Sequence, residues 1–344
     1  MKQAIEQLMR GQNLSPTLMQ EAMEKLMSGA VHEAQIGAFL TALSMKGETV
    51  EEVLAAVQVM RQLAEPVQLP EGIWVETVGT GGDGAHLFNI STASALLAVS
   101  AGAKVAKHGN VGASTATGSA DVLRQAGVEL QLSAQEVAQC MAETGFGFMF
   151  AQRYHQAMKH VVPSRKALGF RTIFNLLGPL ANPAPVKRWV LGVFDEKWLM
   201  PYAEVVKALG AERALVVHAK DGLDEISVCA ETDVVELLPD GTLTRYTLNP
   251  RDFGWDYQDK SALVVQNSAE SLAMIEWLFK DAKHAPAIAV DMLAINTAAV
   301  LRMADLVETW EQGIERAKLM MRGGRAWQVL QKVASVSQQV KGER

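Results

Sequence analysis

A glycine-rich hexapeptide, GTGGDG at residues 79–84, is the strongest candidate for chemistry in this chain. Four of its six residues are glycine, and glycine lets a turn bring bare backbone N–H groups close to an anion. The apolar run Ile73–Val78 precedes the turn, and the polar segment Asn89–Thr92 opens the Ala/Leu-rich run Ala93–Ala101. A strand, a glycine turn and a helix N-terminus in this order favour a bound phosphate, because unpaired N–H groups and the helix dipole both attract negative charge.

A second loop, Lys107–Ser119, concentrates one lysine, three glycines and four hydroxyl side chains in thirteen residues. A fixed positive charge beside neutral donors suits phosphate and sugar oxygens. An ordinary surface turn with helix-capping hydroxyls would have a similar composition. The loop follows the next strand-like run, however, and ligands bind at the carboxyl ends of parallel strands. We therefore expect this loop and the glycine loop to face one ligand.

Carboxylates and arginines supply two further candidate groups. The segment Asp221–Glu225, DGLDE, follows a strand-like run, and Mg²⁺ prefers one or two carboxylates together with substrate phosphates. A solvated acidic turn is the simpler interpretation of such a pair, but two candidate phosphate loops precede it. Arg165, Lys166 and Arg171 could bind a carboxylate in the bidentate geometry of arginine, although alone they resemble a solvated helix face.

Several classes of function are disfavoured. The chain contains neither a P-loop nor the spacing of a dinucleotide fingerprint, and it lacks HExxH and GxSxG. A net charge of −6 without an extended basic block argues against nucleic-acid binding. Cys140 and Cys229 lack metal-ligand spacing and are interpreted as reduced, structural thiols. With no signal-peptide pattern and no apolar run of about 18 residues, we expect a cytoplasmic protein without a membrane partner.

The elements that must position these loops differ along the chain. The first 65 or so residues have helical patterns: Ser15-Pro16 is typical of a helix start, the stripe Ile36–Leu43 ends near Gly47, and Thr49–Glu52 is a capping-box pattern. Pro66 and the residues to 72 then form a linker. The pattern predicts a small helical unit at the N-terminus.

After the linker, strand-like and helical runs alternate, which predicts an α/β domain with a largely parallel sheet. The predicted strands are Trp74–Val78, Lys104–Lys107, Gly147–Ala151, Trp189–Phe194 and Ala214–His218. Asp233–Leu238 and Thr242–Leu248 flank a Pro-Asp-Gly turn and predict an antiparallel hairpin. Further helices are predicted at Ala203–Leu209, Ser268–Phe279, Ala287–Leu301, Glu311–Met321 and Arg325–Val336.

These motifs closely resemble those of the anthranilate phosphoribosyltransferase family. Its GTGGD, NIST, KHGN and DGLDE motifs correspond to Gly79–Asp83, Asn89–Thr92, Lys107–Asn110 and Asp221–Glu225, and the segment Arg171–Ala184 is also similar. The motifs occur in the same order over essentially the whole chain. Several independent motifs in order are far more specific than one glycine loop.

The resemblance implies the two-domain architecture shared by nucleoside phosphorylases and phosphoribosyltransferases. A small all-helical domain, residues 1–69, is joined by a helical segment near 163–186 to a larger α/β domain with a mostly parallel central sheet, residues 70–162 and 187–344. The active site would lie at the hinge between the domains. The resemblance also implies a homodimer formed through the helical domain.

The implied reaction, a step of tryptophan biosynthesis, transfers the 5-phosphoribosyl group of phosphoribosyl pyrophosphate (PRPP) to the amine of anthranilate. The products are N-(5-phosphoribosyl)anthranilate and pyrophosphate, and Mg²⁺ is the implied cofactor. The residues implied for PRPP are Gly79, Gly82, Asp83, Asn89, Ser91, Thr92, Lys107, His108, Gly109, Asn110, Ser114, Thr115 and Gly118. Those implied for anthranilate are Gly79, Asn110, His155 and Arg165, and those for Mg²⁺ are Ser91, Asp224 and Glu225. Because the amine of anthranilate is neutral at pH 7, no residue is assigned as a catalytic acid or base.

The chain departs from the family pattern at three positions near the substrates. Val111 replaces the arginine of KHGNR, Thr115 replaces the second serine of an SS pair, and Gln152 stands where the family usually has proline. Thr115 keeps the hydroxyl. We expect the choice of acceptor to depend on Val111, Gln152 and Arg165.

Two other functions fit the same architecture. A pyrimidine nucleoside phosphorylase would attack a nucleoside with free phosphate and need no metal, and the pair Asp224-Glu225 argues against it. A non-catalytic relative that binds nucleic acid would be expected to lose the glycine loop and gain a basic face. The intact loop and the net charge of −6 disfavour that alternative.

Overall fold

A small helical unit forms the N-terminal part of the chain. The computed structural model describes residues 1–82, 84–112 and 116–342. The unit contains α1 (Lys2–Met9), α2 (Pro16–Ser28), α3 (Glu33–Lys46) and α4 (Val50–Leu63). Ser15 caps α2 by accepting a hydrogen bond from the Leu18 N–H, and Thr49 and Glu52 form the predicted capping box at the start of α4. Both predicted helix starts are confirmed.

The described strands form one seven-stranded sheet in the order β3-β2-β1-β4-β5-β6-β7. Neighbouring strands from β3 to β5 are parallel, whereas β6 and β7 are added antiparallel. The strands are β1 (Trp74–Gly79), β2 (Lys104–Gly109), β3 (Phe146–Phe150), β4 (Arg188–Gly192), β5 (Arg213–Ala219), β6 (Thr232–Leu237) and β7 (Leu243–Leu248). The predicted fold class, a helical unit followed by a mostly parallel α/β part, is confirmed.

Pairing between β1 and β2 is short although both strands are longer. β1 pairs with β2 only at Trp74–Lys104 and Val75–Val105. On their outer sides, β1 stays paired with β4 as far as Gly79–Gly192, and β2 stays paired with β3 as far as Gly109–Phe150. The sheet therefore divides between β1 and β2 toward their carboxyl ends.

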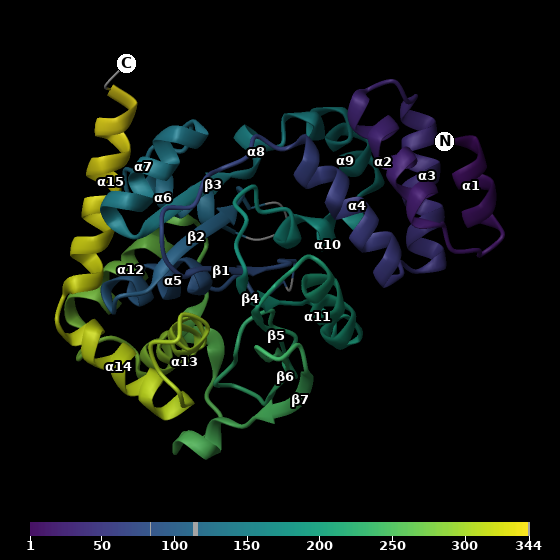
Figure 1. The fold of residues 1–344 in the computed structure, drawn as a ribbon. Coiled ribbons are helices and arrows are strands. Elements are labelled where there is room, and N and C mark those ends of the chain that lie inside the picture. Colours follow the sequence, from purple (N-terminus) through teal and green to yellow (C-terminus); the bar gives the residue numbers. More distant parts are fainter. Residues whose placement is uncertain (83, 113–115, 343–344) are drawn as a thin grey trace.

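Helices cover both faces of the sheet, so that it forms the middle layer (Figure 1). The helices after β1 are α5 (Ile90–Ser100), α6 (Ser119–Gln125), α7 (Ala134–Thr144), α8 (Ala151–Tyr154), α9 (Val162–Leu168), α10 (Ile173–Leu180), α11 (Leu199–Ala208), α12 (Ser268–Asp281), α13 (Ala287–Met303), α14 (Trp310–Arg322) and α15 (Arg325–Gly342). Short 3-10 turns are η1 (Gln156–His160), η2 (Glu196–Trp198), η3 (Pro250–Phe253) and η4 (Lys260–Leu263). In Figure 1, α1–α3 lie at one end of the molecule and α12, α14 and α15 at the other.

Two apolar clusters fill the space between these layers. One contains α5 and α13 with the sheet face of Val75, Val105 and Leu215. The other starts in the helical unit, continues through α10 and α11, and reaches the opposite sheet face at Trp189 and Leu191. The alternation of neighbours such as Trp189 and Val190 between the two clusters is the period of two that a strand imposes.

The chain returns to the helical unit after β3. The predicted connection near 163–186 contains most of α9 and all of α10. α9 packs on α3, and α10 packs on α3 and α4. Over the described residues, no helix has both the length and the apolar character needed to cross a membrane.

Candidate active site

The candidate loops gather at the carboxyl ends of parallel strands. The glycine loop follows β1, and the Asp221–Glu225 loop follows β5. The strand predicted to end at Lys107 continues to Gly109, so the segment Lys107–Asn110 forms the end of β2 and the first residue after it. In an open α/β sheet this edge is where ligands bind. Asp83, Ser114 and Thr115, which the sequence also proposes for this site, lie outside the described residues.

Two carboxylates lie directly against the first loop and the helix that follows it. The Gly81 N–H donates to Asp224 Oδ2 at 2.6 Å, and the Ser91 N–H at the start of α5 donates to Glu225 Oε1 at 3.2 Å. A helix N-terminus stabilises a neighbouring negative charge. The structure thus brings Ser91 into contact with Glu225, which lies 134 positions further along the chain.

The Asp221–Glu225 loop lies close against the ends of β1 and β4 because the paired residues there, Gly79 and Gly192, are both glycine. A Cβ on Gly79 would lie 2.2 Å from Asp224 Oδ2, and one on Gly192 would lie 1.6 Å from the Asp224 carbonyl oxygen. No side chain fits at such distances. The pair Gly79–Gly192 therefore fixes where the Asp224 carboxylate lies.

Lys107 is the buried cation of the site, with 1% of its surface exposed. Its Nζ donates to the Thr77 carbonyl at 2.5 Å and to Ser91 Oγ at 3.2 Å. Burial lowers the pKa of Lys107, while the charges of Glu76, Glu225 and Asp224 act in the opposite direction. The amine thus lies behind Ser91 on the side away from solvent.

Asn89 ties the two candidate phosphate loops together. Its Oδ1 accepts from Thr117 Oγ1 at 3.2 Å and from Ser271 Oγ at 2.7 Å, and its Nδ2 donates to the Thr117 carbonyl at 3.3 Å. The side chain is therefore engaged by the protein on both ends. The neighbouring Thr92 hydroxyl is buried and has no hydrogen-bond partner among the described atoms.

The second loop is held at its base by one carboxylate. Asp121 Oδ2 accepts from the Gly112 N–H at 2.8 Å and from the Gly118 N–H at 2.9 Å. A Cβ on Gly118 would lie 2.4 Å from the Asn110 carbonyl oxygen, and one on Gly109 would lie 2.0 Å from Ser119 Oγ. These close contacts explain why glycine stands at both positions.

Asn110 contacts Val111 and Gln152, the two departures from the family pattern that lie among the described residues. Asn110 Oδ1 accepts from the Val111 N–H at 2.8 Å and from Gln152 Nε2 at 3.2 Å. Val111 is partly buried against the apolar cluster that contains α5 and α13. The Gln152 amide thus orients the Asn110 side chain, which the sequence assigns to the substrates.

Two neutral histidines lie next to this loop. The rings of His108 and His155 meet edge to face, with centroids 5.1 Å apart. Burial lowers the pKa of His108 well below its usual value and that of His155 to about 4. In both rings Nε2 is buried without a hydrogen-bond partner among the described atoms. His155 is thereby placed beside the Lys107–Asn110 loop, as the sequence proposes.

The two candidate arginines have different surroundings. The Arg165 guanidinium lies 5.2 Å from the Phe174 ring centroid, burial lowers its pKa, and the ion pairs found among the described residues do not include it. Arg171 donates from Nη2 to the Gly82 carbonyl and stacks 3.9 Å from the Phe194 ring centroid. Arg165 is thus suited to a carboxylate ligand, whereas Arg171 supports the glycine loop.

Sequence reasoning missed two buried residues behind the site, Glu76 and Asn182. Both Glu76 oxygens accept from the His108 N–H, at 3.0 and 3.3 Å, and Asn182 Nδ2 also donates to Glu76. Burial raises the pKa of Glu76, while the charge of Lys107 and the hydrogen bonds from His108 and Asn182 lower it. The signal that could have revealed Glu76 is a carboxylate inside an apolar strand, since such a residue is rarely buried without partners.

The donor set around Ser91 fits a magnesium ion. Asp224 and Glu225 supply two carboxylates, and the described residues hold no cluster of three or more metal-binding side chains. Mg²⁺ is usually held by one or two carboxylates with substrate phosphates and water, rather than by a complete protein cage. An incomplete protein shell next to a phosphate loop is what such a site requires.

Comparison with known proteins gives one consistent family. Residues 2–64 match the helical bundle domain of the glycosyl transferase family, and residues 71–327 match the a/b domain of that family. The chain is 48% identical to the anthranilate phosphoribosyltransferase of Marinomonas sp. (strain MWYL1), covering 97% of this chain and 96% of the relative. It is 46% identical to that of Cellvibrio japonicus, covering 98% of each.

Solved structures give the same result. The crystal structure of anthranilate phosphoribosyltransferase from Thermus thermophilus superposes with a TM-score of 0.89 and 38% identity, covering 97% of this chain and 99% of that one. The enzyme from Saccharomyces cerevisiae in complex with PRPP and Mg superposes with a TM-score of 0.86 and 25% identity, covering 95% and 94%.

Proposed function

The chain belongs to the anthranilate phosphoribosyltransferase family, and on this premise we propose that it transfers the 5-phosphoribosyl group of PRPP to the amine of anthranilate in tryptophan biosynthesis. The observation that carries the proposal is the convergence of the glycine loop, Lys107 and the carboxylates of Asp224 and Glu225 around Ser91. The relatives named above give no support to a nucleoside phosphorylase or to a nucleic-acid-binding protein.

The phosphates of PRPP bind, in this proposal, between the glycine loop and the start of α5. Backbone N–H groups of the loop and the helix dipole attract the anion, and Lys107 adds a positive charge behind Ser91. The described residues proposed for PRPP are Gly79, Gly82, Asn89, Ser91, Thr92, Lys107, His108, Gly109, Asn110 and Gly118. The contacts of Asn89 indicate that it acts by holding the loops, since its side chain already bonds Thr117 and Ser271.

Ser91, Asp224 and Glu225 are proposed to hold Mg²⁺. When bound, the ion neutralises the charge of the pyrophosphate group. Gly81 and Ser91 orient the two carboxylates through their N–H groups, and Gly79 and Gly192 leave room for the loop that carries them.

Anthranilate is proposed to bind beside Asn110, His155 and Arg165, near Gly79. Arg165 pairs with the carboxylate of the acceptor, and its partial burial strengthens that charge-assisted bond. The amine of anthranilate is neutral and nucleophilic at pH 7, and the buried, neutral rings of His108 and His155 add no charge beside it. As the anomeric C–O bond breaks, the amine nitrogen bonds to that carbon and afterwards releases a proton. The protein acts mainly by orienting the reactants and stabilising the leaving group.

One assay tests the proposed activity. Protein, anthranilate, PRPP and Mg²⁺ are mixed, and the loss of anthranilate fluorescence is followed. We expect a loss that depends on PRPP and on enzyme concentration. Turnover of another amine or of a nucleoside, with anthranilate unchanged at high enzyme concentration, would contradict the proposal.

A double variant tests the metal assignment. Asp224→Asn with Glu225→Gln keeps the size of both side chains but removes both charges, so the dependence of the rate on Mg²⁺ concentration should shift to at least tenfold higher concentration. Direct Mg²⁺ titration in the presence of PRPP should show the same weakening. Glu231→Gln, which removes an ion pair with Lys220 but neither of the proposed metal-binding carboxylates, is the matched control. An unchanged Mg²⁺ requirement in the double variant would show that other groups hold the ion.

We also propose a homodimer formed through the helical unit, and a cytoplasmic location. Met9 of α1 and Met45 of α3 expose 76% and 84% of their surface, and α1 packs against α3. Large exposed apolar side chains favour a protein interface. Both cysteines are free thiols, which suits a reducing compartment. Light scattering after gel filtration should give twice the chain mass of 37.3 kDa, and Met45→Glu should lower it.

A further inference from the structure

The division between β1 and β2 leaves particular backbone groups without a strand partner. Pairing stops at Val75–Val105, although the strands continue to Gly79 and Gly109. Val105 N–H points toward β3, so the N–H and C=O of Ala106 and His108 face β1. A continued parallel ladder would join the Thr77 N–H to the Ala106 carbonyl and the His108 N–H to the Thr77 carbonyl.

Three buried side chains take the place of these ladder bonds. The His108 N–H donates to the Glu76 carboxylate at 3.0 Å, Asn182 Nδ2 donates to the Ala106 carbonyl at 2.9 Å, and Lys107 Nζ donates to the Thr77 carbonyl at 2.5 Å. Three of the four backbone groups that the missing ladder would have joined, the His108 N–H and the Ala106 and Thr77 carbonyls, therefore have a side-chain partner.

The side chains that fill the division also hold one another. Asn182 Nδ2 donates to Glu76 Oε2, and Asn182 Oδ1 accepts from the Ala184 N–H at 2.8 Å. Glu76, Lys107 and Asn182 each expose 2% of their surface or less. Since a buried polar group without a partner is costly, a satisfied set of this kind is stable only as a whole.

The division separates the two loops that the proposed function places around PRPP. The glycine loop leaves β1 and the Lys107–Asn110 loop leaves β2, so the spacing of the strands beyond Val75 sets the spacing of the loops. Lys107 crosses the division to reach Ser91. If β1 and β2 were fully paired, His108 would move toward Thr77 and carry Asn110 with it.

We propose that Glu76 and Asn182 are positioning residues of this enzyme, which keep β1 and β2 apart and thereby set the distance between the two substrate loops. The role rests on the proposed function, because it concerns the geometry of that reaction. Neither residue touches a substrate in this proposal. Their effect reaches the reaction through the backbone of His108 and the amine of Lys107.

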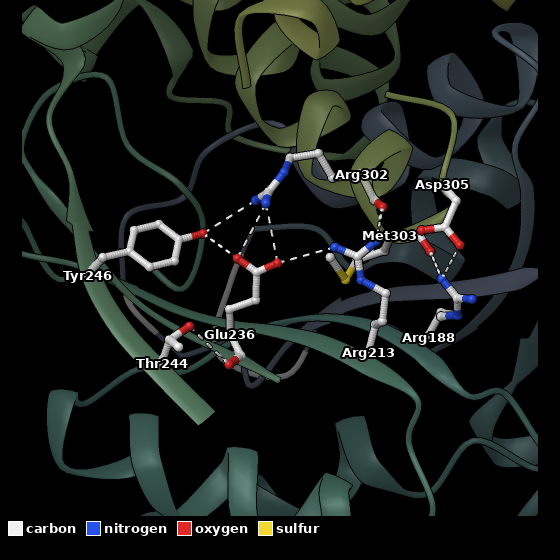
Figure 2. A network of polar contacts seen from close by, with 8 residues as sticks. All are labelled: Arg188, Arg213, Glu236, Thr244, Tyr246, Arg302, Met303 and Asp305. Carbon is white, nitrogen blue, oxygen red and sulfur yellow. Dashed lines mark hydrogen bonds and ion pairs between the residues drawn. The ribbon is translucent and has the colours of Figure 1, made fainter. Parts of the chain in front are cut away.

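A second buried carboxylate on the same sheet provides a control. Glu236 on β6 is 4% exposed and bonds Arg213, Arg302 and the Tyr246 hydroxyl (Figure 2). Arg213 lies at the start of β5, so this network occupies the opposite edge of the sheet from the substrate loops. Glu236→Gln removes a buried strand carboxylate without altering the spacing of β1 and β2.

The kinetic test compares isosteric variants. In Glu76→Gln the volume is unchanged, but one of the two oxygens that face the His108 and Asn182 donors becomes an NH₂ group, and the negative charge beside Lys107 is lost. We expect kcat/KM for both substrates to fall at least tenfold. Adding Asn182→Asp restores a negative charge beside Lys107 but removes the donor to the Ala106 carbonyl, so the double variant should stay at least tenfold below the wild type. Glu236→Gln should lower Tm comparably and leave kcat and both KM values unchanged.

The structural test does not depend on activity. In a crystal structure of Glu76→Ala with Asn182→Ala, pairing should extend to Thr77–Lys107, with the His108 N–H on the Thr77 carbonyl. An undivided ladder in that variant supports the positioning role, because the ladder is observed without measuring activity. Failure of the wild-type enzyme in the anthranilate assay would overturn only the proposed function. Wild-type kcat and KM in Glu76→Gln, or an activity loss in Glu236→Gln as large as in Glu76→Gln, would overturn the positioning role. If the double alanine variant does not fold, the isosteric kinetic comparison decides.

Discussion

Arg165 is the residue on which recognition of the acceptor should depend most directly. Its guanidinium is partly buried over Phe174, and no carboxylate among the described residues neutralises it. Arg165→Gln should raise KM for anthranilate by about 10- to 100-fold, because a charge-assisted hydrogen bond contributes about 1.5–3 kcal/mol. KM for PRPP and Tm should change little. Steady-state kinetics measure both constants, with the exposed neighbour in Lys166→Gln as the control, and an unchanged KM for anthranilate would place its carboxylate elsewhere.

The histidine pair makes stability depend on pH. Burial holds the pKa of His155 at about 4, below the unfolded value of 6.5, so between these values the unfolded chain binds more protons. The contribution of the neutral His155 ring to the free energy of unfolding is complete above pH 6.5 and is lost as pH falls toward 4. A fall from pH 7 to pH 5 should therefore lower the free energy of unfolding by about 2 kcal/mol. Urea unfolding of His155→Gln should show a smaller decrease over this range than the wild type, whereas exposed His284→Gln should keep the wild-type decrease. Equal slopes in all three would contradict the buried neutral state.

The residues proposed to bind a ligand could be predicted from the sequence, whereas the buried residues that support them could not. Gly79 and Lys107 lie at the carboxyl ends of β1 and β2, and Asp224 lies in the loop after β5. All three belong to sequence segments whose composition favours an anion or a metal ion, and the structure brings them to one edge of the sheet. Glu76 and Asn182 were missed because their partners are backbone groups of other strands. Which backbone groups lack a partner depends on pairing in three dimensions, and composition does not contain that information.

At the scale of elements, the glycines that end β1 and β4 determine where the Asp221–Glu225 loop lies. A Cβ on Gly192 would overlap the Asp224 carbonyl oxygen, so Gly192→Ala must displace the loop. We expect a rate at least 100-fold lower at fixed Mg²⁺, and a loss of about 1–3 kcal/mol in stability from overpacking.

Chemical denaturation and Mg²⁺ titration measure the two effects of Gly192→Ala. Gly37→Ala on α3 is the matched control, because nothing lies within 4 Å of the added Cβ. In a helix interior that change should stabilise the chain by up to about 1 kcal/mol. Wild-type activity in Gly192→Ala would mean that the loop does not pack on β4 as described.

Most elements follow from local sequence patterns, but their ends and pairing do not. The strand predicted at Trp189–Phe194 ends at Gly192, and that predicted at Gly147–Ala151 ends at Phe150, where α8 begins. Capping boxes are local in sequence, so the start of α4 was predicted correctly. The early end of pairing between β1 and β2 was not predicted, because apolar periodicity gives the face of a strand and not its neighbour.

At the scale of the whole molecule, one apolar cluster links the helical unit to the sheet. It runs from α2 and α4 through α10 and α11 to Trp189. Residues 1–66 alone should therefore lack a stable fold, since part of their core is supplied by later segments and so short a chain buries little area. Circular dichroism of that fragment should show no cooperative thermal transition, in contrast to the full chain. A native-like transition in the fragment would show that the unit is independent of α10 and α11.

The division between β1 and β2 also has a consequence for the order of folding. Asn182 is 106 residues after Glu76 in the chain, whereas Thr77 and His108 are close neighbours once the first two strands pair. Contacts between nearby segments form sooner, because closing a short loop costs less entropy. During synthesis β1 and β2 can thus pair along their full length before α10 has emerged. Native geometry then requires that these early bonds be exchanged for side-chain bonds once Asn182 arrives, and this exchange sets the final spacing of the two substrate loops.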